Sequence, residues 1–432
     1  MVKVRLEPVR GMRDILEPES NRIKLMFNLF SEVAESYGYE YVITPTLEYF
    51  ELLAAKSGPE ISRSMYVFKD KAGRAVCLRP EFTASIARVF LKYLRARPKP
   101  VKLYYVGPVF RYEEPQFGRY REFFQAGTEY LGDSSTYADI EQLLIIRDYY
   151  GELGLKDYVV KVGSVGIVRR LLTIWGVDEE TQDIIIHYID KKMWEEVLRV
   201  LKRYNKADIG VIEGLINSRV KDYRELDEVS SEIGLSKLGD DIISNELARL
   251  KEIASAAKEL GINMYIDLSF ARGLAYYTGF IFEVEVPDLP FSIAGGGRYD
   301  NLISVYGGPN TPATGFSVGI DRSYIALIKQ GIDLDSRVAR VKVMLIATKD
   351  VSTSYIDEVA SMLRRKLYVV NVRIVKPKKI ADVIGLASRL NYDYVIIIGT
   401  KEYKKGKVTV KNLVKRTQVS VDKDVIREGL PT

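Results

Sequence analysis

The sequence predicts an α+β protein: an antiparallel sheet with helices, a helical insertion within it, and a separate C-terminal α/β domain. Three observations predict this architecture. From about residue 65 to residue 130, apolar and polar residues alternate with period two around one helix, which is typical of antiparallel strands. Residues of about 165–260 follow the 3.6-residue rhythm of helices, and strand patterns return up to Gly319. From residue 339 onward, strands and helices alternate, as in a largely parallel sheet.

The length of the chain also predicts more than one domain. A chain of 432 residues exceeds what one compact core usually holds. The changes of pattern place a first domain at residues 1–330, with the helical insertion at about 165–260. A linker at 331–338 and a second domain at 339–432 complete the expected division.

The first elements can be assigned from periodicity and breakers. A helix is expected over about 20–37, because apolar residues recur at helical spacing between a possible N-cap, Ser20, and the terminating Gly38. The stretch "YEYVITP" predicts a strand that stops at Pro45. One helix, at about residues 83–93, interrupts the period-two region that follows.

The C-terminal domain has a simple predicted pattern of alternating strands and helices, and its net charge is unusual. "VKVMLIATKD", "YVVNVRIVK" and "YDYVIIIGT" predict strands, and "SYIDEVASMLRRKL" and "KIADVIGLASRLN" predict the helices between them. Residues 339–432 carry 20 Lys and Arg against 9 Asp and Glu, a net charge of +11, whereas residues 1–338 carry a net charge of −5. A basic module on a slightly acidic body is typical of a polyanion-binding appendage, although a solvated lysine-rich surface would have the same composition.

Composition excludes several classes of chemistry. The single cysteine, Cys77, leaves no intramolecular disulfide or cysteine metal cluster, and we expect its side chain in the core. The single histidine, His187, excludes a histidine-based metal site, catalytic triad or general base, and we expect an exposed or half-packed helix residue there. The apolar runs are too short for a membrane span, and the N-terminal residues lack a signal-peptide core, so a cytoplasmic protein without membrane contact is expected.

The stretch "FRYEEPQFGRYREFFQAGTE", residues 110–129, holds the densest chemistry. If it forms two strands around a turn, then Arg121, Phe123, Gln125, Gly127 and Glu129 share one face of the second strand. That face offers a cation, a flat ring, an amide, a gap and a carboxylate, which suits a ligand with an anionic group, a ring and a polar tip. A ladder of cross-strand ion pairs is the alternative.

Two further stretches extend this interpretation. In "ARGLAYYTGFIFEVEV", residues 271–286, the strand pattern puts Tyr277, Gly279, Ile281 and Glu283 on one face. "AGGGRYDNLI" is glycine-rich, which by itself is a weak phosphate-binding signal. "TPATGFSVGIDR" leads from a strand of small residues into a helix that carries Arg322.

Together these motifs resemble the class II aminoacyl-tRNA synthetases, and among them histidyl-tRNA synthetase. "VRGMRDILEPE" is similar to the opening of that family, "YGYEYVITPTLE" to class II motif 1, and "LRPEFTA" to the amino-acid-binding loop. "FRYEEPQFGRYREFFQAGTE" resembles motif 2, "RGLAYYTG" the histidine signature, and "GFSVGIDR" motif 3. The resemblance covers essentially the whole chain, with its six motifs in order.

The resemblance implies histidine activation by ATP, followed by transfer to tRNA(His), in a cytoplasmic homodimer. It implies that Mg²⁺ accompanies ATP, with no resident metal ligands. Catalytic roles fall on Arg111, Arg272 and Arg322, and ATP binding on Arg111, Glu113, Arg119, Phe123 and Arg322. Histidine binding falls on Glu81, Phe82, Thr83, Arg111, Gln125, Glu129, Arg272, Tyr276, Tyr277 and Tyr299. The basic stretches "KPKK" and "KEYKKGK", with Tyr403 for base stacking, are the expected RNA contacts of the C-terminal domain.

Two departures and two alternatives accompany this resemblance. Ala275 stands where many members carry Asp, and Phe124 where His or Tyr is common; we expect neither side chain to face the ligand. A catalytically inactive, synthetase-like regulatory subunit of ATP phosphoribosyltransferase is the main alternative, but such subunits generally lack the anticodon-binding domain. A threonyl or prolyl enzyme would share the three class II motifs but not "RGLAYY".

Overall fold

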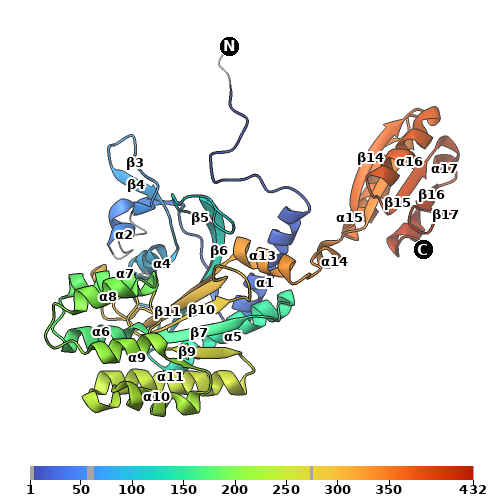
Figure 1. Cartoon of the computed structure of the whole chain (residues 1–432). Helices are drawn as coiled ribbons and strands as arrows, with labels where there is room; N and C mark the ends of the chain where they lie inside the picture. Colours follow the sequence, from blue (N-terminus) through green and yellow to red (C-terminus); the bar gives the residue numbers. More distant parts are fainter. Residues whose placement is uncertain (1–3, 56–62, 273–275, 432) are drawn as a thin grey trace. The chain divides into compact units, whose positions relative to one another are not determined.

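The computed structural model describes residues 4–55, 63–272 and 276–431. The chain divides into two compact units, residues 1–334 and residues 335–432, which are described separately below (Figure 1). Within the described ranges, no helix is both long enough and apolar enough to cross a membrane.

The core of the first unit is a mixed sheet, in which nine strands can be followed through the described residues. Their order is β1 (Glu40–Tyr41), β5 (Val101–Phe110), β6 (Glu122–Leu131), β12 (Ala313–Gly319), β11 (Ala294–Arg298), β10 (Phe280–Glu285), β7 (Val159–Ser164), β9 (Met264–Asp267) and β8 (Arg219–Val220). The strands from β5 to β7 are antiparallel to their neighbours, as predicted. The pairs β1–β5 and β7–β9 are parallel, so the sheet is not purely antiparallel.

The predicted strand that ends at Pro45 is wrong in extent, because β1 covers only Glu40–Tyr41. Val42 still donates its N–H to the Tyr104 carbonyl at 3.0 Å, but the chain then leaves the sheet. The buried guanidinium of Arg79 takes the Thr44 carbonyl instead, at 2.8 Å. A side chain therefore satisfies the backbone where a neighbouring strand was expected.

Helices cover the two faces of this sheet. α1 (Glu19–Ser36) and α5 (Thr136–Leu153) pack on one face, together with inward-pointing side chains such as Tyr104 and Ala126. α4 (Thr83–Val89), which continues as a π-helical turn over Phe90–Leu94, packs on the opposite face with Leu103 and Tyr105. This division follows the alternation of side chains along β5 and β6.

The start of α1 differs from the prediction. The N-cap position is Pro18, without a side-chain capping bond, and Ser20 already lies within the first turn. Cys77 is fully buried, as predicted, in a small sheet of β2 (Leu47–Tyr49), β4 (Ala75–Leu78) and β3 (Val67–Lys69) beside α2 (Phe50–Ala54).

Helices fill the chain between β7 and β9, and Figure 1 shows them gathered beside those strands. Their bounds are α6 (Val165–Ile174), α7 (Glu179–Asp190), α8 (Trp194–Leu201), α9 (Ile209–Asn217), α10 (Leu226–Ile233) and α11 (Asp241–Glu259). His187 lies half-buried in α7, as predicted. Side-chain caps set several of the starts: Asp240, for example, accepts from the N–H groups of Ile242 and Ile243 at the beginning of α11. α12 (Leu302–Val305) and α13 (Ile320–Lys329) complete the unit.

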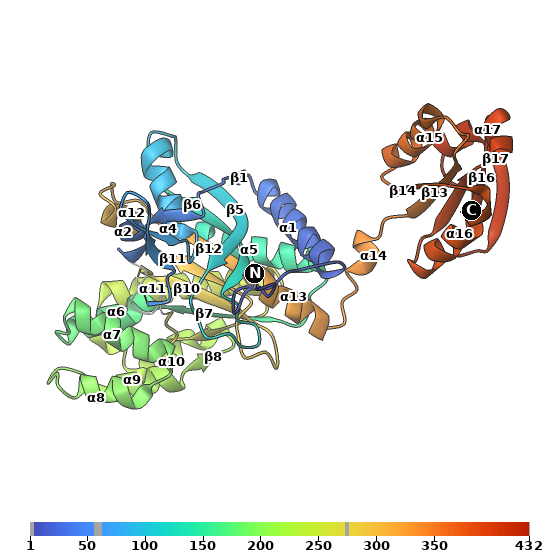
Figure 2. The same ribbon diagram turned by 90° about the horizontal axis from the view of Figure 1, so that it is seen from above.

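The second unit is an α/β fold with helices on both faces of its sheet (Figure 2). The strand order is β14 (Val369–Val375), β13 (Lys342–Thr348), β15 (Tyr394–Ile398), β16 (Lys407–Asn412) and β17 (Thr417–Asp422). The first three strands are parallel, as predicted, and a β16–β17 hairpin that the sequence analysis did not assign adds an antiparallel edge. Alternate residues of β13 pack against α15 (Thr353–Arg365) and α16 (Ile380–Arg389). α14 (Asp335–Val338) and α17 (Thr400–Lys404) are short.

Candidate active site

A cavity lies on the α4 face of the large sheet, and small residues form its floor. The strand registers align Tyr105, Gly127, Ser317, Gly295 and Glu283 in one row across β5, β6, β12, β11 and β10. Directly opposite residues in a sheet point to the same face. Two glycines and a serine in the middle of this row therefore leave an open space with larger polar side chains at both ends.

One end of the cavity is closed by a buried carboxylate. Glu129 of β6 is 1% exposed and accepts hydrogen bonds from the Thr83 hydroxyl at 2.8 Å and from the Tyr299 hydroxyl. The Tyr105 hydroxyl is 3.4 Å from the same carboxylate. Burial raises the pKa of Glu129 to about 8, although the bonds from Tyr299 and Thr83 favour its charged form. Gly315 makes room for this carboxylate, because a Cβ there would meet Glu129 Oε2 at 2.1 Å.

The start of α4 supplies the next group of polar atoms. Glu81 accepts from the N–H groups of Thr83 at 2.6 Å and Ala84 at 3.1 Å, so its carboxylate caps the first turn of the helix while facing the cavity. Burial raises the pKa of Glu81. Gln125 of β6 also faces the cavity, and its Oε1 atom is buried without a hydrogen-bond partner among the described residues. A buried acceptor without a partner is costly, and a donor from a bound ligand would satisfy it.

Three tyrosines form an aromatic wall beside Glu129. Tyr276 lies 4.9 Å from Tyr277 and 5.7 Å from Tyr299, measured between ring centroids, and all three line the cavity. The signature around Tyr276 lies partly outside the described residues, since Gly273, Leu274 and Ala275 fall between the described ranges. The expectation that Ala275 faces away from the ligand therefore stays a prediction.

The other end of the cavity is rich in arginine. Arg272 donates from Nη1 to the Phe282 carbonyl at 2.9 Å, and its Nε lies 3.9 Å from Glu283 Oε1. Arg111 donates from Nε to the Pro80 carbonyl at 3.0 Å. Arg322 donates to the carbonyls of Gly118 at 2.9 Å and Ser292 at 3.3 Å. In each case backbone oxygen orients the guanidinium.

Arg322 is electrostatically unsatisfied. Burial, together with the nearby charges of Arg119 and Arg111, lowers its pKa to about 10 against the weaker effect of Glu113. Several like charges in a partly desolvated space attract anions strongly. This end of the cavity is therefore built to receive a polyanion.

The loop between β5 and β6 lies beside the arginines at the cationic end of the cavity. Gln116 and Arg119 close its turn with N–H to carbonyl bonds of 3.3 and 2.8 Å. Gly118 has a φ of 70°, and a Cβ there would meet the Phe291 ring at 2.2 Å, so the turn requires glycine. Arg119 Nη1 lies 3.5 Å from Glu113 Oε2, and the Arg111 guanidinium is 5.4 Å from the centre of the Phe123 ring. A carboxylate and a half-buried ring are thus held beside the cationic end.

The structure brings most of the expected site residues to this one cavity. Those that line it are Glu81, Thr83, Arg111, Glu113, Arg119, Phe123, Gln125, Arg272, Tyr276, Tyr277, Tyr299 and Arg322. Glu129 lies directly behind Thr83 and Tyr299. Phe82 does not line the cavity: its ring stacks on Tyr105 at 4.1 Å beneath the Arg79 guanidinium.

Two expectations about neighbouring side chains have different outcomes. Arg121 shares the parity of Phe123 but does not line the cavity, because its Nε donates to the Glu113 carbonyl and its guanidinium stacks on Tyr112 at 3.9 Å. Phe124 packs edge-on against Phe27 of α1 at 5.2 Å, on the opposite face of the sheet, as expected.

Sequence reasoning did not assign Tyr105 or Glu283 to the site, although both line the cavity. Burial raises the pKa of Glu283, but Arg272 and Lys161 outweigh this effect and leave the pKa below its ordinary value. The one signal in the sequence for Glu283 was the alternation along the 280–285 strand, which puts its side chain on the same face as Tyr277. Tyr105 required knowledge that β5 pairs with β6 so that Tyr105 lies opposite Gly127.

The glycine-rich run is also explained. Gly295, Gly296 and Gly297 lie in strand β11 and not in a phosphate-binding loop. A Cβ on Gly295 would meet Arg272 Nη1 at 1.8 Å, so this glycine gives the arginine its place.

The arrangement can hold a ligand with an anionic end and a polar ring, and it positions no histidine or cysteine against that ligand. Across the described residues, no group of three or more His, Cys, Asp or Glu side chains could hold a metal ion by itself. The three arginines, each oriented by a backbone oxygen, favour chemistry driven by positioning and charge stabilisation.

Comparisons with known proteins agree with this geometry. The model of the histidyl-tRNA synthetase family matches residues 11–322, and that of the anticodon binding domain matches residues 341–431. A curated relative from Sulfolobus acidocaldarius, named histidine–tRNA ligase, is 42% identical over 426 residues. The aligned region covers 98% of this chain and 98% of that relative.

Two solved structures are similar over most of the chain. One is a Bacillus halodurans protein described as an ATP phosphoribosyltransferase regulatory subunit/histidyl-tRNA synthetase, with a TM-score of 0.77, 26% identity, and coverage of 92% of this chain and 100% of that one. The other is the apo histidyl-tRNA synthetase of S. aureus, with a TM-score of 0.70, 25% identity, and coverage of 98% and 99%.

Proposed function

Because the chain belongs to the histidyl-tRNA synthetase family, we propose that it is a histidine–tRNA ligase. It activates histidine with ATP to histidyl-adenylate and transfers the histidyl group to the 3′-terminal adenosine of tRNA(His). One observation carries the proposal: three oriented arginines and the unpartnered Gln125 oxygen line a single cavity whose far end is closed by the Tyr299–Glu129 pair.

Activation needs no general base, because the carboxylate of histidine is already ionised near neutral pH. This carboxylate attacks the α-phosphorus, a new P–O bond forms, and the bond to the bridging oxygen breaks to release diphosphate. Arg111 and Arg272 hold the α-phosphate and stabilise the charge that develops there. Arg322 holds the γ-phosphate, and the lowered pKa of its guanidinium is the expected state before an anion arrives.

The remaining ATP contacts come from the β5–β6 loop. Glu113 accepts from the adenine amino group, the ring stacks on Phe123, and Arg119 contacts the phosphates. Mg²⁺ would enter with ATP and would supply neutralisation of the phosphate charge. Such an ion needs only one or two protein carboxylates, and Glu283, which lines the cavity beside Arg272, would hold it.

Histidine occupies the carboxylate end. The Gln125 oxygen accepts from the α-ammonium group, with Glu81 and Thr83 beside it. Glu129 accepts from the imidazole N–H, and a tyrosine hydroxyl donates to the second ring nitrogen, since neutral imidazole offers one donor and one acceptor. Tyr276, Tyr277 and Tyr299 supply the wall, and Phe82 supports it from behind through Tyr105.

The predicted C-terminal domain, residues 339–432, binds the anticodon region of tRNA through its basic surface, with residues 331–338 as a linker. We place the protein in the cytoplasm, where its substrates are found, and infer a homodimer. The exposed side chains of Tyr41, Ile43, Leu47 and Tyr49, in the segment similar to motif 1, support this inference.

ATP–diphosphate exchange with each of the twenty amino acids tests the proposal. We expect exchange with histidine alone. A protein that binds histidine but exchanges with no amino acid would instead be a regulatory subunit. Arg272→Ala is the matched control, because it should abolish exchange while leaving histidine binding measurable by calorimetry.

A further inference from the structure

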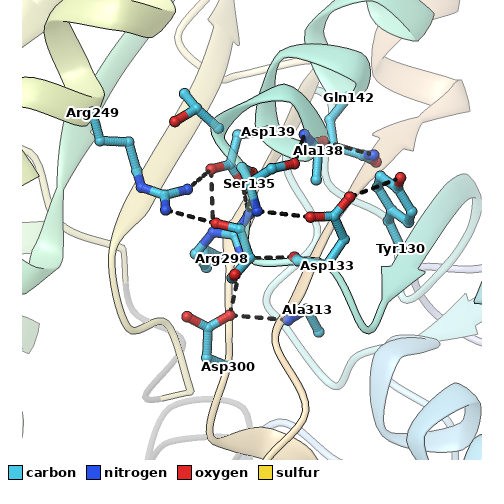
Figure 3. Close-up of polar contacts among 12 residues, drawn as sticks. Tyr130, Asp133, Ser135, Ala138, Asp139, Gln142, Arg249, Arg298, Asp300 and Ala313 are labelled. Carbon is cyan, nitrogen blue, oxygen red and sulfur yellow. Dashed lines mark hydrogen bonds and ion pairs between the residues drawn. The ribbon is translucent and has the colours of Figure 1, made fainter. Parts of the chain in front are cut away.

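A fully buried carboxylate outside the cavity joins three parts of the first unit. Asp139 of α5 is 0% exposed and lies between two guanidinium groups (Figure 3). Arg298, at the end of β11, places Nε 3.1 Å from Asp139 Oδ2 and Nη2 3.0 Å from Oδ1. Arg249 of α11 donates from Nη1 to Asp139 Oδ2 at 2.6 Å.

Arg298 also holds the loop that follows β6. Its Nη1 donates to the Asp133 carbonyl at 3.1 Å, and its Nη2 donates to the Ser135 carbonyl at 3.1 Å. Glu129 lies in the strand that leads into this loop. Arg298 therefore ties the end of β11 to the end of β6 from the side opposite the cavity.

The residues on both sides of Tyr299 are fixed by the same network. Asp300 Oδ1 accepts from Arg298 Nη1 at 3.2 Å and from the Ala313 N–H at 2.9 Å. Tyr299 itself donates its N–H to the Ala313 carbonyl at 2.8 Å. The backbone that carries the tyrosine therefore cannot shift without breaking its bonds to Ala313 of β12.

The network reaches the aromatic wall as well. The Thr278 N–H donates to the Arg298 carbonyl at 2.8 Å, and the Asp300 N–H donates to Thr278 Oγ1 at 3.1 Å. Thr278 directly follows Tyr277. The backbone at Tyr277 and Tyr299, two of the three tyrosines of the wall, is thus held by one set of directional bonds.

We propose that Arg298 and Asp139 are positioning residues for histidine recognition, which fix Tyr299 against Glu129 from behind the sheet. This rests on the proposed function, since it assigns the Tyr299–Glu129 pair to the imidazole. A buried ion pair adds little to stability compared with apolar packing, whereas its directional bonds define one geometry. The forked guanidinium of Arg298, which reaches the carboxylate and two carbonyls at once, is the kind of contact that lysine does not reproduce.

The test compares Arg298→Lys with Arg170→Lys in histidine-dependent ATP–diphosphate exchange. Arg170 also binds an aspartate through two nitrogens, Nε at 2.8 Å and Nη2 at 2.7 Å from Asp240, but this pair anchors the start of α11 and makes no contact with β11. We expect Arg298→Lys to raise the KM for histidine on the order of 10- to 100-fold, because displacement of about 1 Å can cost 10²-fold. The KM for ATP should change by less than about threefold, and Arg170→Lys should change neither constant by more than that.

A double variant separates positioning from a general structural role. If Arg298 acts through Tyr299, the effects of Arg298→Lys and Tyr299→Phe on the KM for histidine should not multiply, and the double variant should resemble the more severe single variant. Multiplied effects, or equal increases in the two KM values, would overturn the proposal. An absence of exchange by the wild-type protein would instead refute the proposed function.

Asp300→Ala covers the case in which Arg298→Lys does not fold. The Asp300 side chain is 33% exposed, so its removal leaves no fully buried charge without a partner. It breaks the bonds to Arg298 and Ala313, and we expect the same selective rise in the KM for histidine. A wild-type KM in a folded Asp300→Ala protein would contradict the inference.

Discussion

Addition of one methyl group at Gly295 should disable Arg272 without unfolding the protein. In Gly295→Ala the new Cβ would lie 1.8 Å from Arg272 Nη1, 2.7 Å from its Cζ and 3.0 Å from its Nη2. The guanidinium must retreat by roughly 1.5 Å to restore ordinary contact, which also breaks its bond to the Phe282 carbonyl. The backbone is not strained, because Gly295 lies in an ordinary strand conformation.

The expected effect follows from the role of the displaced group. Loss of one donor to developing charge costs on the order of 10²–10³ in rate, or about 3–4 kcal/mol of transition-state stabilisation. We therefore expect the kcat for ATP–diphosphate exchange to fall at least about 10²-fold, with histidine binding retained. Combination with Arg272→Ala should add little, because both changes remove the same interaction.

Two glycine controls make the test specific. Gly151→Ala on α5 meets nothing within 4 Å, so activity and melting temperature should be unchanged or slightly raised. Gly296→Ala would place its Cβ 2.2 Å from the Gly315 carbonyl oxygen, and this backbone clash should lower the melting temperature. Near-normal exchange by Gly295→Ala, or a loss of stability equal to that of Gly296→Ala, would refute the reasoning.

Three further predictions concern other parts of the molecule. Burial raises the pKa of Glu129 to about 8, so between pH 4.5 and 8 the folded protein keeps a proton that the unfolded chain releases, and stability falls as the pH rises. In Glu129→Gln this fall should be absent, and at pH 8 the variant should be more stable than the wild type by up to a few kcal/mol, at about 1.4 kcal/mol per unit of pH. Chemical unfolding at pH 5 and at pH 8 measures the difference in stability between the two proteins. A difference that does not depend on pH would contradict the prediction. Gln125→Leu should leave stability nearly unchanged, because Oε1 has no partner in the described structure, but it should raise the KM for histidine roughly 10- to 150-fold through loss of a bond to a cation. Residues 1–334 alone should retain exchange and lose tRNA charging, whose rate in the full chain should also fall with salt; equal loss of both activities in a folded truncation would argue against the assigned roles.

Local pattern was enough to predict the elements whose signal lies within one segment. The helical rhythm predicted α1, and the parity of β6 predicted that Phe123 and Gln125 share a face. Pairing between distant segments was not available from one sequence. For that reason Tyr105 was missed, since its place depends on its position opposite Gly127, and the short parallel β1 was predicted too long.

The family motifs predicted more of the site residues than periodicity did, but they did not predict where each side chain points. Phe82 shares a motif with Thr83, yet its ring lies under Arg79, because consecutive residues at the start of a helix point about 100° apart. The role of the glycine run of β11 could not be predicted from the sequence, because it depends on contact with Arg272. Arg272 approaches it from 23 residues earlier in the chain, and such a contact depends on the tertiary fold.

The placement of helices on both faces of the second unit limits how it can meet RNA. α15 and α16 cover β13 from opposite sides, and the Tyr403 ring packs edge-on against Tyr355 at 5.1 Å. The central strands therefore offer no open aromatic platform on which successive bases could stack. We therefore propose that strand-end loops and helix surfaces, such as the exposed lysines at 376–379, contact splayed nucleotides one at a time. Each base of the anticodon should then contribute separately to the binding affinity. A change of one base should remove the contribution of that base and leave the contributions of its neighbours unchanged.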